Sequence, residues 1–313
     1  MNKLEERRIL DAVYSHLNPL SVTESESPDF VCEAFGNKFG VEVTEFFVSE
    51  SEARLQKLPG YGLALLKGGE YRHKNDRASL KVEDVTYHVQ GDEKGIPIRA
   101  VRLEVPSAVE VAKRVMNVIA KKDTKCNEYL ASVSPVDLLI HDSERATTRH
   151  GIEQLLRAFL RPEPAAELIK SKFREIYLLA PKDQASCDCL PLRANAFAAE
   201  ICTIQHMFLK YFDDGTQGDL LIALSSHLSS KFPSAEYTAT EEEFAFLLGS
   251  FACYFRHDGK LAFEHVTTEI ERRPILPDLS GDIDAKFTEY VKLNRDEEFM
   301  IVLLSYPTEM SSG

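Results

Sequence analysis

The amino-acid sequence predicts an α/β protein in which a mixed central sheet flanked by helices is followed by a mostly helical second half. Three observations support this fold class. Apolar residues recur at helical spacing in residues 4–17 and again after Pro106. Two alternating apolar runs are joined by Gly36 and Asn37, a pair typical of a tight β-hairpin. Residues 136–142 form a nearly continuous apolar run with the length of a buried strand.

In the first half, the order of predicted elements is helix, strand, strand, insertion, helix, strand, helix and strand, a layered α/β arrangement. The helix after Pro106 has the strongest signal, because proline is favourable in a first turn and good helix formers follow it. The insertion, at 51–105, holds a possible helix and two β-like runs. The predicted elements are a helix at 4–17, strands at 29–35 and 38–47, a helix at 106–130, a strand at 136–142, a helix at 150–160 and a strand at 174–180.

Beyond residue 180 the apolar patterns predict mainly helices. A domain boundary is therefore expected near that position, which gives a first domain at 1–180 and an acidic second domain at 181–313. The elements predicted for the second domain are helices at 192–212, 218–230 and 240–255, a strand at 261–266, a helix near 282–293 and a strand at 299–304.

Charge is distributed unevenly between the two halves. The whole chain has a net charge of −13, but residues 1–180 hold 26 Lys and Arg against 28 Asp and Glu, a net −2, so −11 falls on the rest. A nearly neutral first half is free to carry a local basic face for a polyanion such as DNA. For the acidic C-terminal half, a protein partner or a homo-oligomer contact is an open alternative.

Composition also bears on location and on reaction class. The six cysteines are scattered, which suits free thiols in a reducing compartment. No apolar segment is long enough to cross a membrane, and the amino terminus lacks the apolar core of a secretion signal, so a cytoplasmic location is expected. The sequence has no H-E-x-x-H, G-x-x-x-x-G-K-[ST] or G-x-S-x-G motif, which disfavours zinc hydrolases, nucleotide-driven motors and serine hydrolases.

Two carboxylates in the predicted hairpin can converge. Asp29 opens the first strand, and Glu42 shares one face of the second strand with Thr44. Hard divalent cations such as Mg²⁺ prefer oxygen ligands, usually one or two carboxylates with phosphate and water completing the shell. A site for Mg²⁺ or Mn²⁺ on Asp29 and Glu42 is therefore predicted. The simpler alternative is that Asp29 caps a turn and Glu42 is solvated on an outer strand.

The residues Pro28-Asp29 and, thirteen residues on from Asp29, Glu42-Val43-Thr44 resemble the motif of the PD-(D/E)XK nuclease superfamily, the restriction-endonuclease-like proteins. The resemblance covers roughly residues 1–180 and implies a helix-strand-strand-strand-helix-strand core. It implies that Asp29 and Glu42 bind the metal. In the superfamily, a lysine two residues after the second acid orients water and stabilises charge. This sequence has Thr44 at that position.

A lysine from the long helix is the predicted substitute. The apolar face of this helix runs through Val111, Val115 and Val118 and, in the same register, continues with Lys122, Lys125 and Tyr129. Relocation of the lysine to this helix is a known variation in the superfamily. The sequence thus predicts Lys122 and Lys125 as catalytic cations, with Tyr129, Thr44 and Lys38 as substrate-binding residues. The alternative is that the last turns of the helix are simply solvated.

Two functions follow from these observations. The first is metal-dependent phosphodiester hydrolysis of nucleic acid, with DNA as the expected substrate. The second, suggested by Thr44 and by the acidic second half, is a catalytically degenerate nuclease fold that binds nucleic acid or a protein partner without cleavage.

Overall fold

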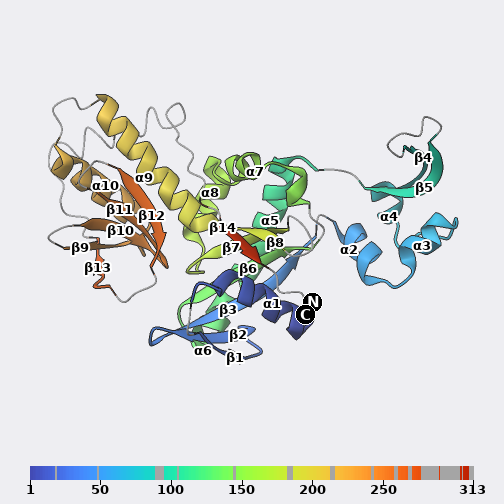
Figure 1. The fold of residues 1–313 in the computed structure, drawn as a ribbon, viewed down its shortest axis with the longest axis horizontal. Coiled ribbons are helices and arrows are strands. Elements are labelled where there is room, and N and C mark those ends of the chain that lie inside the picture. Colours follow the sequence, from blue (N-terminus) through green and yellow to red (C-terminus); the bar gives the residue numbers. More distant parts are fainter. Residues whose placement is uncertain are drawn as a thin grey trace.

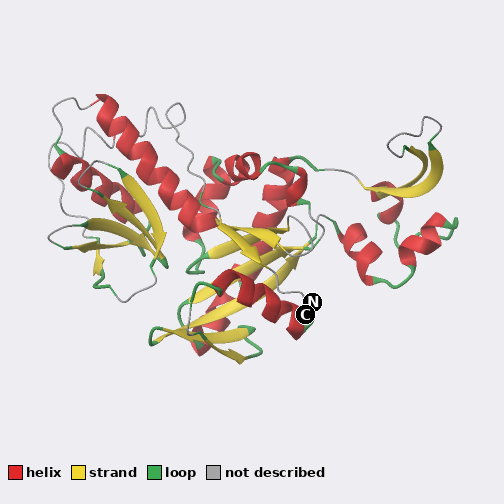
Figure 2. Cartoon of the chain, viewed as in Figure 1, coloured by secondary structure: helices red, strands yellow, loops and turns green. Residues whose placement is uncertain are grey.

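The computed structural model (Figure 1) confirms a mixed α/β protein with a mixed central sheet flanked by helices. The secondary structure is shown in Figure 2. The structure describes residues 1–17, 20–47, 49–88, 95–103, 106–143, 146–181, 186–211, 216–240, 243–256, 260–266, 270–275, 289, 304 and 306–309. In this part of the chain no helix is long and apolar enough to span a bilayer.

The central sheet has seven strands in the order β1-β2-β3-β6-β7-β8-β14. β1, β2 and β3 form an antiparallel meander, β6 and β7 continue it in parallel, and β8 and β14 are antiparallel again. The division into two domains near residue 180 stays a prediction, but the sheet itself takes two strands from beyond that residue. The strands are β1 (Ser21–Glu24), β2 (Phe30–Ala34), β3 (Asn37–Phe46), β6 (Val136–Asp142), β7 (Ile176–Pro181), β8 (Ser186–Pro191) and β14 (Tyr306–Glu309).

Helices cover both faces of this sheet because its inner strands are apolar on both sides. On one face, α1 packs against residues of β3, β6 and β7 such as Val43, Leu139 and Leu179. On the other face, a second set of helices packs against Leu138 and Ile140. That set comprises α5 (Ala108–Asp123), α6 (Cys126–Ser132), α7 (Ile152–Phe159) and α8 (Pro162–Lys170), whereas α1 spans Lys3–Tyr14 and the short 3₁₀ helix η1 spans Thr147–Arg149.

The predicted hairpin is present, with its turn one residue earlier than expected. β2 and β3 pair in register from Phe30 opposite Val41 to Ala34 opposite Asn37. Phe35 and Gly36 form the two-residue turn, with φ of 51° and 77°. Both residues are left-handed, as a tight hairpin turn of this type requires. Residues 21–24, in a stretch rich in polar residues, add β1 to the hairpin.

The helix predicted at 106–130 is present as two helices with a break between them. α5 ends at Asp123, Thr124 and Lys125 form a turn, and α6 begins at Cys126. The predicted helix at 282–293 and strand at 299–304 lie almost entirely outside the described residues.

Among its described residues the second half is not mostly helical, which corrects the sequence prediction. Helices α9 and α10 match the prediction, but the segment expected as a helix at 240–255 is a β-hairpin around Gly249, whose φ is 58°. An apolar run of five residues fits a buried strand as well as a helix, so periodicity could not decide. The elements are α9 (Leu192–Tyr211), α10 (Gln217–Lys231) and a five-stranded sheet of β9 (Glu236–Ala239), β10 (Phe244–Leu248), β11 (Phe251–Phe255), β12 (Leu261–His265) and β13 (Arg273–Pro274).

The insertion forms a small unit that projects from one end of the molecule (Figure 1). Its three short helices and one two-stranded ribbon enclose a separate apolar cluster built on Tyr61, Leu65 and Leu80. The elements are α2 (Glu50–Lys57), α3 (Tyr61–Leu66), α4 (Asp76–Ser79), β4 (Leu80–Tyr87) and β5 (Ile96–Leu103). We refer to residues 50–88 and 95–103 as the arm.

Candidate active site

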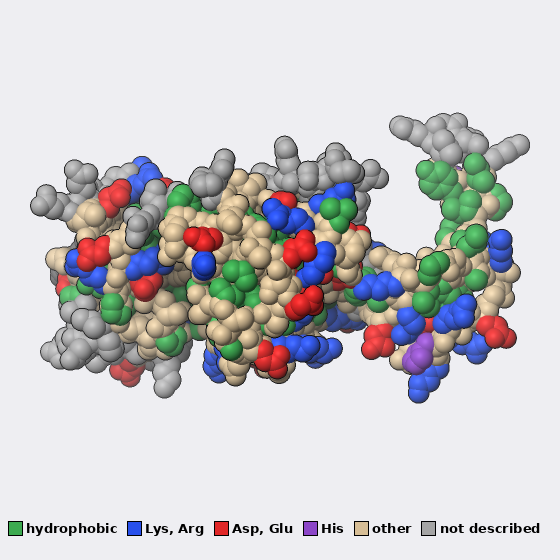
Figure 3. Space-filling model, turned by 90° about the horizontal axis from the view of Figure 1, so that it is seen from below, with side chains coloured by type: hydrophobic (Ala, Val, Ile, Leu, Met, Phe, Trp, Pro, Cys, Tyr) green, Lys and Arg blue, Asp and Glu red, His purple; other side chains and the backbone are tan. Residues whose placement is uncertain are grey.

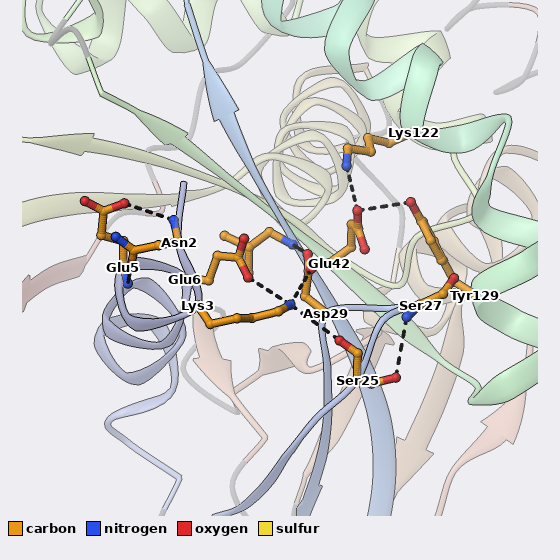
Figure 4. Close-up of polar contacts among 11 residues, drawn as sticks. Asn2, Lys3, Glu5, Glu6, Ser25, Ser27, Asp29, Glu42, Lys122 and Tyr129 are labelled. Atoms are coloured by element: carbon orange, nitrogen blue, oxygen red, sulfur yellow. Dashed lines mark hydrogen bonds and ion pairs between the residues drawn. The ribbon is translucent and has the colours of Figure 1, made fainter. Parts of the chain in front are cut away.

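Asp29 lies directly before β2, at the end of the hairpin away from its turn, and it makes two charge-assisted contacts (Figure 4). Its Oδ2 accepts a hydrogen bond from the backbone N–H of Val43 at 2.9 Å. Its Oδ1 accepts one from Nζ of Lys3, also at 2.9 Å. The bond to Val43 holds Asp29 beside β3. Because Glu42 directly precedes Val43 in the chain, Asp29 lies next to Glu42.

Glu42 points from β3 toward α5 and α6, and its side chain is only 8% exposed. Its Oε1 accepts hydrogen bonds from Nζ of Lys122 at 2.6 Å and from the hydroxyl of Tyr129 at 3.0 Å. Lys122 is separated from Glu42 by 80 residues and Tyr129 by 87. The α5–α6 pair therefore closes over the middle of β3 (Figure 4).

The local sequence explains how Lys122 is held. Ser107 caps the amino terminus of α5, with Glu110 completing a capping box. The buried apolar stripe of α5, through Val111, Val115 and Ile119, fixes its rotation on the sheet. Lys122 continues this stripe by one step in the last turn, so its ammonium group reaches inward while its stem lies along the apolar surface.

Burial and mutual charge shift the pKa values of the site. Burial raises the pKa of Glu42, and the charge of Asp29 raises it further, while the hydrogen bond from Lys122 opposes the shift. Burial and the charge of Glu42 raise the pKa of Tyr129, so its phenol stays protonated and donates. Burial lowers the pKa of Lys3, but hydrogen bonds to Asp29 and Glu6 outweigh that effect and leave the pKa raised.

Four of the predicted site residues lie together: Asp29, Glu42, Lys122 and Tyr129 (Figure 4). Thr44 is half-buried two residues along β3 from Glu42, on the same strand face.

Lys125 and Lys38 do not join this group. Lys125 caps the start of α6 with an exposed side chain, and in the described part of the chain no hydrogen bond connects it to Glu42 or Asp29. The expected stripe assumed an unbroken helix, and the turn at Thr124 rotates Lys125 out of it. Lys38, at the hairpin end of β3, is 68% exposed and lies 3.8 Å from Glu33. It lines a cleft of about 1230 Å³ whose lining includes neither carboxylate.

Sequence reasoning missed Lys3 and Glu6. Both come from the first turns of α1, where Lys3 bridges Glu6 at 3.0 Å and Asp29 at 2.9 Å. Their i,i+3 spacing is typical of any exposed helical ion pair, so no sequence signal pointed to this site. With them the cluster holds three carboxylates and two ammonium groups, a net charge of −1.

The donor set fits a hard divalent cation. Asp29 and Glu42 supply carboxylate oxygens, the ligands that Mg²⁺ and Mn²⁺ prefer. Among the described residues, both hydrogen bonds to Glu42 fall on Oε1, which leaves Oε2 for another ligand. The net negative charge of the cluster favours a cation here, because a cation relieves the repulsion between the carboxylates.

Glu42→Gln is expected to change how stability depends on pH. The folded carboxyl binds its proton more tightly than the unfolded one, so its contribution to stability is largest below pH 4.5. That contribution is lost as the pH rises through the raised folded pKa. The free energy of unfolding of the unmodified protein should thus fall, relative to the variant, as the pH rises above 4.5. Urea unfolding at several pH values measures this difference, and parallel curves would contradict the assignment.

Comparison with known protein families, curated proteins and solved structures finds no match to this chain.

Proposed function

We propose that this chain is a metal-dependent phosphodiesterase that hydrolyses nucleic acid, with DNA as its substrate class. One observation carries the proposal: the buried Glu42 accepts a hydrogen bond from Lys122 of a distant helix, while Asp29 is fixed beside it by the backbone of Val43. Anionic and cationic groups from separate elements thus meet at one point. Such a cluster suits a reaction in which a metal and an ammonium group share the charge of a phosphate.

The order of elements supports a restriction-endonuclease-like fold. Helix α1 is followed by the meander β1-β2-β3, then by α5 and by β6, which runs parallel to β3. This is the helix-strand-strand-strand-helix-strand order that the PD-(D/E)XK resemblance implies. Asp29 precedes the second strand, and Glu42 lies in the third.

Each residue of the site has a distinct role in this proposal. Asp29 and Glu42 would hold the metal, which when bound supplies an activated water and offsets charge on the phosphate. Lys122 replaces the lysine that is absent at Thr44 and stabilises the negative charge that develops on the phosphate oxygens. Burial and the charge of Glu42 keep the phenol of Tyr129 protonated, so it donates a hydrogen bond to Oε1 of Glu42. Lys3 orients Asp29 through the hydrogen bond at 2.9 Å.

Nicking of supercoiled plasmid tests the proposed function. The purified protein should convert plasmid to open-circular and linear forms with Mg²⁺ or Mn²⁺ and should lose this activity in excess EDTA. The reason is that neither carboxylate can activate water for attack on a phosphodiester without the metal.

The degenerate alternative predicts a different result. Without a competent cation, the protein would bind nucleic acid and leave it intact with either metal. Binding in a gel-shift assay together with intact plasmid would therefore reject hydrolysis and retain only the binding function.

A further inference from the structure

The arm carries a net positive charge in an acidic chain. In the sequence, residues 50–103 hold ten Lys and Arg against eight Asp and Glu, a net +2, whereas the whole chain carries −13. A local positive charge on an otherwise negative protein concentrates polyanions at that place. Figure 3 shows the arm standing off from the body, with Lys and Arg side chains gathered along it.

Several cations of the arm have no acidic partner. Arg54 and Lys57, by contrast, are engaged by Asp76 and Glu45. Within the described residues no ion pair joins the remaining loop cations to a carboxylate, and all are exposed. They run from the end of α3 to the second residue of β4: Lys67, Arg72, Lys74, Arg77 and Lys81.

The loop that carries these cations is held in a fixed conformation. Asp76 is fully buried, and it accepts hydrogen bonds from Arg54 at 2.6 Å and from the hydroxyl of Tyr61 at 2.7 Å. The same Tyr61 hydroxyl accepts the backbone N–H of Arg72 at 3.0 Å. The two ends of the segment 72–76 are therefore tied to one buried network, which presents the exposed cations without a large loss of entropy on binding.

The ribbon next to this loop has a face suited to the same ligand. Lys81 lies directly opposite Arg102 in the β4–β5 register. Glu83, two residues along the same strand, pairs with Arg102 at 3.4 Å, so Lys81 is the cation of this opposed pair that is left for another anion. Further along the same face, the opposed pairs Val85–Ile98 and Tyr87–Ile96 are exposed by between 38% and 57%.

From these observations we infer that the arm is a clamp for double-stranded nucleic acid, which deepens the proposed function and rests on it. Lys67, Arg72, Lys74, Arg77 and Lys81 contact phosphates, since this spread of unpaired charge matches a duplex backbone. The two-stranded ribbon has the width that a major groove admits, and its apolar end contacts base edges there.

The arm would grip the duplex to one side of the cut. It begins five residues after Glu45 and eight residues after Glu42 in the chain. At a strand rise of about 3.4 Å per residue, the end of β3 lies roughly 14 Å from Glu42, and the arm lies beyond the end of β3. The arm therefore adds affinity only for a duplex that extends several base pairs past the cleaved bond.

Salt-dependent binding tests this inference with the full chain in EDTA, so that no cleavage occurs. Fluorescence anisotropy is measured on a labelled duplex of about 24 base pairs, roughly two helical turns. The triple variant Arg72→Gln, Lys74→Gln, Arg77→Gln should weaken binding by about tenfold or more and flatten the slope of log affinity against log salt by about 2 to 3. The matched control is Arg149→Gln, Arg161→Gln, Lys170→Gln, which removes the same charge from exposed sites outside the arm and should leave the slope unchanged.

Hydrolysis of bis(p-nitrophenyl) phosphate measures the active site without the arm, because this diester is too small to contact both at once. The arm variant should hydrolyse it at the rate of the unmodified protein with Mn²⁺. If the unmodified protein does not hydrolyse it but still binds duplex through the arm, the proposed function fails and the clamp stands.

Two results would overturn the clamp. One is duplex affinity and salt slope in the arm variant equal to those of the unmodified protein. The other is a dimer in solution that dissociates in the double variant Val85→Ser, Ile98→Ser while duplex affinity is unchanged. That result would make the ribbon a self-association surface.

Discussion

Lys122→Met is expected to reduce plasmid cleavage by about 10²- to 10³-fold, because it removes the one helix-borne ammonium that contacts Glu42 in the described site. Lys125→Met is the matched control. Lys125 lies three residues from Lys122, and its replacement by Met makes the same change in charge and side-chain structure. The side chain of Lys125, however, is exposed at the start of α6. We expect its initial rate of nicking with Mg²⁺ to stay close to that of the unmodified protein.

Loss of Lys122 also leaves Glu42 buried with only the hydroxyl of Tyr129, which costs stability on the order of 1–3 kcal/mol. Urea unfolding distinguishes this cost from loss of catalysis, because a folded but inactive variant shows a full cooperative transition. Equal rates for the two lysine variants would contradict the assignment. A Lys122→Met variant with normal activity would shift the role of the cation to Lys3.

The part of the site that the sequence could predict is the part built from local signals. Alternating apolar residues and a short turn specify the β2–β3 hairpin, and strand parity then gives the face of Glu42. Lys122 was reached by a similar argument, as an interruption in the apolar stripe of α5. The structure brings Asp29, Glu42, Lys122 and Tyr129 together, and their catalytic roles remain predictions.

Lys125 shows where helical periodicity fails. The stripe through Lys122, Lys125 and Tyr129 requires one continuous helix, but the chain turns at Thr124. Lys122 and Tyr129 still meet at Glu42, because each belongs to a separate helix that packs on the sheet. No proline or glycine marks that turn, so the break could not be seen in the sequence.

Lys3 and the β10–β11 hairpin were missed for different reasons. The contact between Lys3 and Asp29 joins the first helix to a loop 26 residues later, and only tertiary packing creates it. The hairpin lies in an apolar run that suits either secondary structure, and pairing with β9 and β12 decides in favour of strands. Propensity is a weak guide wherever such long-range pairing is available.

Asp29→Asn should abolish metal binding with little change in the fold. The amide oxygen can still accept the N–H of Val43, which Asp29 now binds at 2.9 Å, so the hairpin keeps its cap. The substitution removes one carboxylate ligand and makes neutral a cluster whose net charge is −1, so the cluster no longer attracts a divalent cation. Glu24→Gln, on the adjacent strand β1 opposite Phe30, removes the same charge from an exposed side chain that is not part of the cluster, and it serves as the control.

Titration calorimetry with Mn²⁺ at neutral pH compares the unmodified chain with Asp29→Asn, Glu42→Gln and Glu24→Gln. We expect saturable Mn²⁺ binding to the unmodified chain and to Glu24→Gln, and none to the other two variants. Equal binding to all four proteins, or no binding to the unmodified chain, would contradict a metal site on these carboxylates.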